Sequence, residues 1–223
     1  MELSRAEDIL GVRFKDRSLL KEALSHPSFS GENPGEPSYE RLEFLGDAIL
    51  NFIIAERLFS LFPNLSEGEL THMRSSLVKG ENLSRVARKL SLGELLILGK
   101  GEDMRGGRDN DRTLASALEA VIGAIFRDKG YRAVRKFVLR IFSDGFEEMK
   151  RVGVRKDSRS LLQEIVQAER KLTPRYRSKR KEGGFYAEVF VGREVIGAGY
   201  GRSKKEAKRN AAEDALRKMG RWE

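Results

Sequence analysis

The sequence predicts an all-α first domain followed by a small α+β domain with the element order helix, three strands, helix (α-β-β-β-α). Apolar residues recur at helical spacing up to about residue 150, whereas after Arg175 three stretches alternate in the manner of strands. The charge changes at the same place. From Lys150 onward 21 Lys and Arg oppose 10 Asp and Glu, against 22 and 24 before it. A basic module joined to a slightly acidic one indicates nucleic-acid binding coupled to another activity.

Length and composition limit the class of protein. A chain of 223 residues is long enough to form two domains. The absence of Cys excludes disulfides, thiolate metal sites and cysteine nucleophiles. The sequence contains no apolar stretch typical of a signal peptide or a membrane span, so we expect a cytoplasmic protein without a membrane partner.

The elements of the first domain are all expected to be helices. Two short amphipathic helices lie within Glu2–Ser30, and His26 next to Pro27 is expected to cap or pack rather than to bind metal. Ser66 and Glu69 form a capping-box pattern at the start of a later helix. The Gly-rich stretch 99–111 lacks the Lys-Ser/Thr of a phosphate-binding loop and is expected to be a mobile surface loop. The other expected helices are 40–53, 82–90, 92–98, 112–126 and those within 131–150.

The stretch Glu40–Ile53, ERLEFLGDAILNFI, carries the first candidate site. At about 100° per residue, Glu40, Glu43 and Asp47 share one narrow stripe. Like charges this close repel one another, and Mg²⁺ would neutralise them. The alternative is a solvated acidic face. The apolar residues expected to form the opposite, buried side are Leu42, Leu45, Ile49, Phe52 and Ile53.

Two further residues of this helix are unusual. Phe44 projects among the carboxylates, where an exposed aromatic side chain often marks a contact surface. Gly46 in mid-helix costs about 1 kcal/mol relative to Ala. That cost predicts that another backbone approaches closely at Gly46.

Glu119 is the only charge inside the nearly wholly apolar stretch 112–126. An ionised carboxylate in such a helix is costly unless it is paired or bound to a metal ion. Glu119 is therefore the second candidate site, with a buried salt bridge as the alternative.

The second domain follows a polar, basic linker that contains Gly153. Its expected elements are a helix at 160–170 capped by Asp157 or Ser158, strands at 175–181, 185–191 and 194–201, and a helix at 204–219. The N-terminus of this last helix is crowded by cations, although helix N-termini favour acidic side chains. The crowding is explained if a polyanion docks there, and the alternative is a solvated basic helix end. The residues concerned are Arg202, Lys204, Lys205 and Lys208.

Together these motifs resemble a known family. The segment ERLEFLGDA at Glu40–Ala48 closely resembles the signature helix of ribonuclease III, a double-stranded-RNA endonuclease. The resemblance extends to ALSHPS, SEGELTHMRSSLV, GGRDNDRTLASALEAVIGAIF and SKKEAKRNAAEDAL. It implies the bacterial two-domain form, with a nuclease domain at 1–148, a linker at 149–157 and a double-stranded-RNA-binding domain at 158–223.

The resemblance implies a function as well. Nuclease domains of the family are homodimers with two active centres along a valley that holds an RNA duplex. The expected reaction is Mg²⁺-dependent hydrolysis, with Mn²⁺ as a substitute, that leaves 5′-phosphate and 3′-hydroxyl ends with short 3′ overhangs. The expected substrates are ribosomal and other structured precursor RNAs, messenger RNA among them, and no small-molecule cofactor is expected.

By resemblance, Glu43, Asp47 and Glu119 would be metal ligands, with Asp47 and Glu119 closest to the chemistry. Glu40 and Glu67 match acidic positions that position RNA at the cleavage site. Phe44 would belong to the dimer interface.

Ser116 departs from the family, which has Asp at this position. A hydroxyl is a poor Mg²⁺ ligand and carries no charge, so we expect weakened metal affinity, with water in the vacant place. The alternative is a catalytically impaired protein that only binds double-stranded RNA. An RNA chaperone is a third possibility, but it would not explain why the other acids are retained.

The second domain also matches its family with one gap. Gln163 and Glu164 match residues that contact the RNA minor groove, and Lys204, Lys205 and Lys208 match those that hold phosphates. The first strand loop, Glu182-Gly183-Gly184, lacks the usual His.

Overall fold

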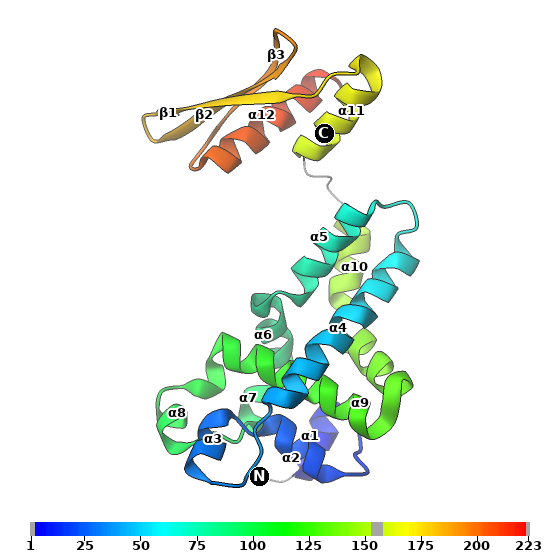
Figure 1. Cartoon of the computed structure of the whole chain (residues 1–223), viewed down its shortest axis with the longest axis vertical. Coiled ribbons are helices and arrows are strands. Elements are labelled where there is room, and N and C mark those ends of the chain that lie inside the picture. Colours follow the sequence, from blue (N-terminus) through cyan, green and yellow to red (C-terminus); the bar gives the residue numbers. More distant parts are fainter. Residues whose placement is uncertain (1–2, 153–157, 222–223) are drawn as a thin grey trace. The chain divides into compact units, whose positions relative to one another are not determined.

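The computed structural model describes residues 3–152 and 158–221 (Figure 1). The chain divides into two compact units, Met1–Arg151 and Val152–Glu223. The first is helical, and the second contains three antiparallel strands flanked by helices. The predicted fold class is therefore confirmed.

The first unit contains more helical segments than the sequence predicts. A third short helix, Pro27–Glu32, follows the two that were expected in the N-terminal region. The stretch 99–111, which was expected to be a mobile loop, contains two short helical segments. The elements are α1 (Leu3–Leu10), α2 (Arg17–Leu24), α3 (Pro27–Glu32), α4 (Glu40–Leu61), α5 (Glu67–Val78), α6 (Gly80–Lys89), α7 (Leu92–Leu95), α8 (Lys100–Met104), the 3₁₀ helix η1 (Gly107–Asp109), α9 (Asp111–Ile141) and α10 (Ser143–Val152).

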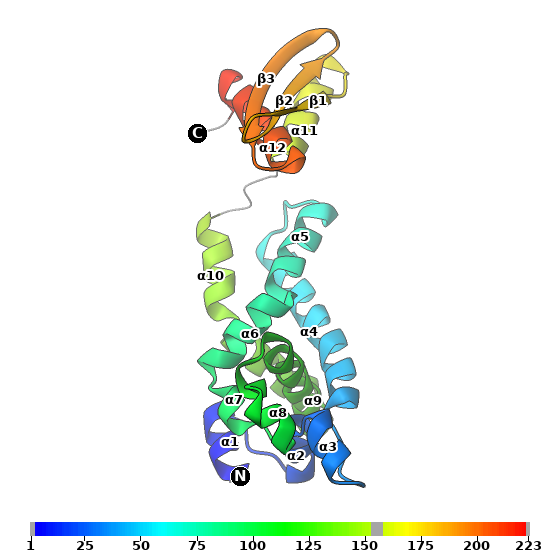
Figure 2. The same cartoon turned by 90° about the vertical axis from the view of Figure 1, so that its left-hand side faces the viewer.

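The core of this unit is the crossing of α4 and α9, which lie side by side in Figures 1 and 2. Two glycines allow the close approach. A Cβ atom on Gly46 would overlap the carbonyl oxygen of Glu119, and one on Gly123 would overlap the carbonyl oxygen of Leu42. The predicted backbone approach at Gly46 is confirmed, and it brings Glu119 against the acidic helix.

The buried face of α4 differs in part from the prediction. Leu42 and Ile53 are buried as expected, but Phe52 is 60% exposed. The buried residues of α4 span about 200° to 360° when Glu40 is set to 0°, and they centre at about 270°, between Gly46 and Leu50. Phe52 lies at about 120° on the same scale, so it points away from α9. Glu43 and Asp47, at about 300° and 340°, share the side of the helix that carries the buried residues instead of lying opposite it.

Two predicted helix caps are present in the first unit. The Nδ1 atom of His26 accepts a hydrogen bond from the Ser28 backbone N–H at 3.0 Å and so caps α3. Ser66 and Glu69 form the complete capping box of α5. Both are structural roles, as expected.

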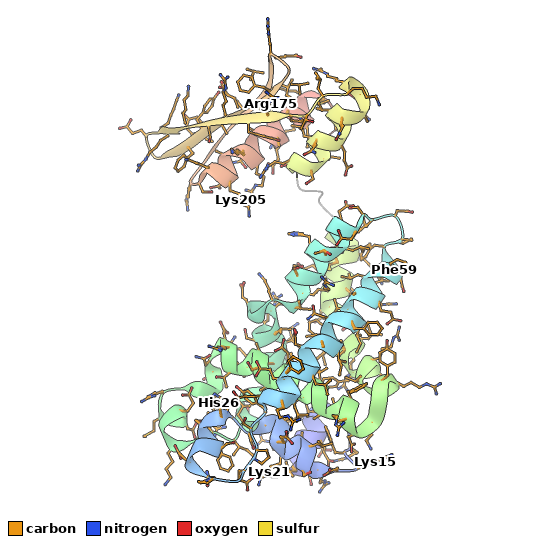
Figure 3. All side chains as sticks on the ribbon, in the orientation of Figure 1. Lys15, Lys21, His26, Phe59, Arg175 and Lys205 are labelled. Carbon is orange, nitrogen blue, oxygen red and sulfur yellow. The ribbon has the colours of Figure 1, made fainter. Side chains whose placement is uncertain are left out.

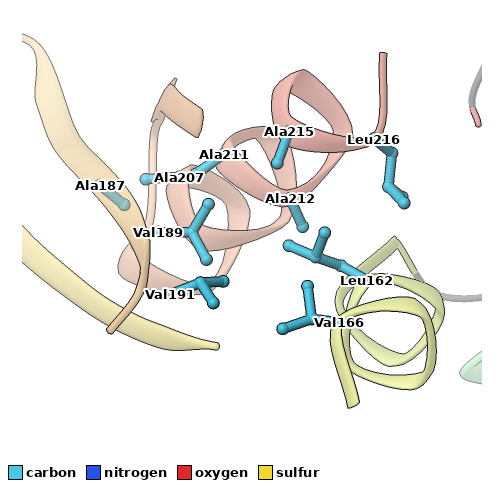
Figure 4. Close-up of a cluster of buried hydrophobic side chains, with 10 residues drawn as sticks. All are labelled: Leu162, Val166, Ala187, Val189, Val191, Ala207, Ala211, Ala212, Ala215 and Leu216. Atoms are coloured by element: carbon cyan, nitrogen blue, oxygen red, sulfur yellow. The ribbon is translucent and has the colours of Figure 1, made fainter. Parts of the chain in front are cut away.

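The second unit consists of α11 (Ser158–Arg170), β1 (Arg175–Lys181), β2 (Gly184–Val191), β3 (Glu194–Gly201) and α12 (Lys204–Lys218). The strands form one antiparallel sheet in the order β1-β2-β3. Alternate residues of β2, such as Ala187 and Val189, pack against both helices (Figure 4). The sheet therefore has one face covered by helices and one face free of them.

The predicted linker is described only in part. Its first residues, 149–152, belong to α10, and residues 153–157, including Gly153 and Asp157, lie outside the described residues. In the described part of the chain, no helix is both long and apolar enough to cross a membrane.

Candidate active site

Three predicted carboxylates lie around the crossing of α4 and α9. Glu43 and Asp47 lie on either side of Gly46, whose backbone contacts that of Glu119 on α9. Asp47 accepts a hydrogen bond from the Asn51 side chain at 2.8 Å. The close approach of the two backbones thus places an acid of α9 beside two acids of α4.

The environment of Glu119 disfavours its ionised form. Burial, followed by the negative charges of Asp47 and Glu43, raises the pKa of Glu119 from 4.5 to about 7. No cation among these causes acts in the opposite direction. The negative charges of Asp47 and Glu43 therefore act unfavourably on ionised Glu119, and no cation among the described residues offsets them there.

Among the residues that the structure describes, Glu119 has no partner for the buried salt bridge considered above. None of Glu40, Glu43, Asp47 and Glu119 forms an ion pair with any residue that the structure describes. Unpaired carboxylate oxygens are the ligands that Mg²⁺ and other hard cations prefer. The chemistry of the donor set therefore fits a divalent metal ion.

The three carboxylates are not arranged as a complete set of metal ligands. Across residues 3–152 and 158–221, no three His, Asp or Glu side chains are close enough to form a ready metal-binding group. Repulsion between carboxylates favours such a spread arrangement. A divalent cation would have to draw the three side chains together.

Ser116 lies one helical turn before Glu119 on α9 and is 8% exposed. Its side chain forms a hydrogen bond with that of Tyr39, which is 4% exposed. Burial and the neighbouring charge of Glu43 raise the pKa of Tyr39 to about 12. A neutral pair of hydroxyl groups therefore occupies the place where the family pattern has a carboxylate, a pairing that no sequence pattern indicated.

Asp109 and Asp111, which precede α9 or begin it, do not replace the carboxylate that is missing at Ser116. The carboxylate of Asp111 is held by Arg88 of α6, with Oδ1 and Nη1 2.7 Å apart. That contact also holds the pKa of Asp111 below its ordinary value, chiefly through the hydrogen bond from Arg88. The side chain of Asp109 is exposed and does not contribute to the pKa shift of Glu119.

The other two predicted acids are not among the groups that shift the pKa of Glu119. Glu40, at the start of α4, accepts a hydrogen bond from Ser38 at 2.8 Å. Glu67 begins α5 and lines a groove together with Phe59. Phe59 is twelve residues after Asp47 on α4, which corresponds to about 18 Å along the helix. Within one chain, Glu67 is therefore not part of the carboxylate group.

An exposed aromatic row follows α4. Phe44 is 80%, Phe52 60% and Phe59 72% exposed, and Phe59 projects from the helix in Figure 3. These three lie at about 40°, 120° and 100° around the helix, so they share one side. Phe52 and Phe59 also line a mainly apolar groove of about 640 Å³. The sequence indicated only Phe44, although the row repeats at seven- to eight-residue spacing.

In the second unit, the predicted RNA-contacting side chains are on the helices. Gln163 and Glu164 are exposed on α11. At the start of α12, Ser203 caps the helix by accepting a hydrogen bond from the Glu206 backbone N–H at 3.1 Å. The surrounding cations form no ion pair with any described residue and so are available to an anion. They are Arg202, Lys204, Lys205 and Lys208.

Comparisons with known proteins cover nearly the whole chain. A family model described as Ribonuclease-III-like matches residues 16–145, and one described as Double-stranded RNA binding motif matches residues 158–219. A protein of Dehalococcoides mccartyi named Ribonuclease 3 is 46% identical, with 98% of this chain and 95% of that protein covered. A Ribonuclease 3 of Borreliella afzelii is 42% identical, with 98% and 91% covered.

A solved structure resembles the first unit. The nuclease domain of ribonuclease III from Campylobacter jejuni, described as flexible in the region involved in dimer formation, matches with a TM-score of 0.61 and 36% identity. The match covers 66% of this chain and 99% of that domain.

Proposed function

The chain belongs to the ribonuclease III family, and we propose that it is a Mg²⁺-dependent endonuclease that hydrolyses phosphodiesters of double-stranded RNA. The observation that carries this proposal is the group of three unpaired carboxylates at the crossing of α4 and α9. Relatives named Ribonuclease 3 do not favour the alternative of a protein that only binds RNA.

Nuclease domains of this family generally use a divalent metal ion. When bound, such an ion activates water and stabilises the leaving oxygen of a phosphodiester. In this chain, Glu43, Asp47 and Glu119 would hold it, and Mn²⁺ could replace Mg²⁺. Glu119 would bind as the ionised carboxylate, since a bound cation would favour its charged form and so offset the burial and the neighbouring negative charges that otherwise raise its pKa.

Ser116 sets a limit on metal affinity. Its hydroxyl group is neutral and already bonded to Tyr39, so it offers a nearby cation neither charge nor a free ligand of comparable strength. We infer that water takes the place of the family's carboxylate. Metal binding is then weaker than with Asp at this position, while the other three ligands remain.

We further propose that the enzyme is a homodimer joined along the aromatic row of α4. Three exposed phenylalanines and an apolar groove on one side of a helix are typical of a surface that a partner covers. A second copy is also the only source of a Glu67 near the carboxylates, since Glu67 of the same chain lies too far along α4. Phe52→Glu is expected to raise the monomer fraction in sedimentation velocity, and an unchanged dimer would place the interface elsewhere.

The second unit would bind the double-stranded RNA substrate. The unpaired cations around the start of α12 suit the phosphates of a duplex, while Gln163 and Glu164 face its minor groove. We propose products with 5′-phosphate and 3′-hydroxyl ends and short 3′ overhangs, and structured precursors of ribosomal and messenger RNA as substrates. Glu40 would position the RNA. The cytoplasmic location and the domain limits at 148 and 158 stay predictions.

The test is cutting of a long RNA duplex in Mg²⁺ by the parent chain beside Glu119→Gln and Ser116→Asp. We expect the parent to cut, Glu119→Gln to cut about 10³-fold more slowly, and Ser116→Asp to need less Mg²⁺ for half-maximal rate. All three proteins should bind the duplex equally in EDTA. A parent that binds but does not cut, beside a Ser116→Asp variant that does, would contradict the enzymatic function of this chain.

A further inference from the structure

The sheet of the second unit carries a row of cations on the face that the helices leave free. Because strand residues alternate, the burial of Ala187 and Val189 against the helices places Tyr186 and Glu188 on the opposite face. Their register partners on β1 are Lys179 and Arg177. The same alternation along β1 gives four exposed cations, about 7 Å apart, on this face. They are Arg175, Arg177, Lys179 and Lys181.

These cations are not neutralised by the protein. None of the four forms an ion pair with a residue that the structure describes. The one acid among their register partners is Glu188, opposite Arg177. A row of like charges on a strand repels itself, so it favours an anionic partner that follows the strand.

Two tyrosines stand beside this row. Tyr186 and Tyr200 are register partners on β2 and β3, and the centroids of their rings are 5.1 Å apart. Tyr200 is 52% exposed. The Nζ atom of Lys181 lies 5.2 Å from one ring centroid and 5.8 Å from the other. Cations and aromatic rings are thus interleaved on one open surface.

Apart from Lys181, which adjoins the 182–184 loop, this surface is separate from the one expected to hold duplex RNA. Gln163, Lys205 and Lys208 belong to α11 and α12, which cover the other face of the sheet. Figure 3 shows Arg175 on the sheet side and Lys205 on the helix side of this unit. One duplex lying against the helices would therefore leave the tyrosines and the β1 row uncovered.

We propose that this free face, defined by Arg175, Arg177, Lys179, Lys181, Tyr186 and Tyr200, binds unpaired RNA. Phosphates of an extended strand lie along the cations of β1, and bases stack on the two rings. Base faces are hidden inside a duplex, so exposed rings can stack only on unpaired nucleotides. An acidic peptide would use the cations alone and leave the tyrosines without a role.

The test measures binding of a fluorescein-labelled oligouridylate of about 12 nucleotides to the full chain in EDTA, by anisotropy. Tyr186→Thr/Tyr200→Thr removes both rings and keeps residues that favour strands. We expect its affinity to fall about tenfold, whereas Tyr186→Phe/Tyr200→Phe keeps the parent's affinity. Lys179→Gln/Lys181→Gln should lose a similar factor and also show a weaker salt dependence.

The matched control is Lys205→Gln/Lys208→Gln, which removes two cations from the helix side. It should weaken duplex binding and leave oligouridylate binding within about twofold, while the sheet variants do the reverse. Equal loss of oligouridylate affinity in the control and the sheet variants would overturn the proposal, because unpaired RNA would then use the duplex surface. Displacement of the RNA by oligoglutamate as effectively as by unlabelled oligouridylate would also overturn it. If the Thr variant does not fold, the Phe and Gln variants decide between these outcomes.

Discussion

The two units of this protein both gather like charges without neutralising them, but they do so in different surroundings. In the first unit, Glu43, Asp47 and Glu119 meet at a tight helix crossing, where burial raises the pKa of Glu119 to about 7. In the second unit, the cations of β1 and of the start of α12 stand exposed on two faces of a small domain.

The difference indicates what each group can bind. Charges in a partly buried site interact strongly, and only a small cation close to all three carboxylates can relieve their repulsion. Exposed cations are screened by water and salt, so they repel one another weakly and can face a large polyanion. The first arrangement suits metal-assisted chemistry, and the second suits salt-sensitive binding of nucleic acid.

The largest effect is expected from widening the helix crossing that creates the carboxylate group. In Gly46→Ala, the new methyl group would overlap the backbone of Glu119 and force α4 and α9 apart. We expect the free energy of unfolding to fall by about 3 kcal/mol or more, as measured by urea denaturation. The control is Gly68→Ala, a helical glycine with open space around its Cα. That variant should be neutral or up to about 1 kcal/mol more stable, and equal losses in both variants would contradict the close crossing.

A smaller effect concerns pH. Because the folded state raises the pKa of Glu119 from 4.5 to about 7, folding favours its protonated form. This contribution to stability is fully present below pH 4.5 and is lost as the pH rises through 7. The loss is less than about 3.4 kcal/mol, because solvent screens the charge of this partly exposed carboxyl group. In EDTA, the parent should lose stability over this range relative to Glu119→Gln, and Mg²⁺ should remove the difference. If the free energies of unfolding of the parent and of Glu119→Gln change equally with pH, the proposed destabilisation by ionised Glu119 is contradicted.

The smallest effect concerns salt and the second unit. Replacing Lys205 and Lys208 by Ala should lower the slope of log affinity for duplex RNA against log salt by about 1 for each phosphate that is no longer neutralised. Stability should change little, since both residues are free of ion pairs with the described part of the chain. Fluorescence anisotropy over a salt series measures the slope. An unchanged slope would indicate that the duplex binds to another surface.

Local patterns predicted most of this architecture. The three strands were predicted to within one residue, because alternation and glycine turns are properties of neighbouring residues. The close approach at Gly46 also agrees with the sequence, since it followed from a locally costly residue. For Glu119 the sequence left a metal site and a buried salt bridge open as alternatives.

What was not predictable depends on contacts between distant segments. The Tyr39–Ser116 hydrogen bond exists only because α4 and α9 cross where they do. Phe52 was expected in the core, but the side of α4 that is buried is set by Gly46 and its partner helix. The free face of the sheet was not predictable either, because alternation alone does not indicate which side of a strand the helices cover.

We propose that the carboxylates at the crossing form one metal site, and that Ser116 lowers its affinity for the ion. Titration of Mn²⁺ into the full chain, followed by the electron paramagnetic resonance signal of the free ion, tests it without any catalytic readout. Relative to the parent, affinity should fall at least tenfold in Glu119→Gln and rise in Ser116→Asp, because the first removes a charged ligand and the second adds one. Equal Mn²⁺ affinity in all three proteins would contradict the account.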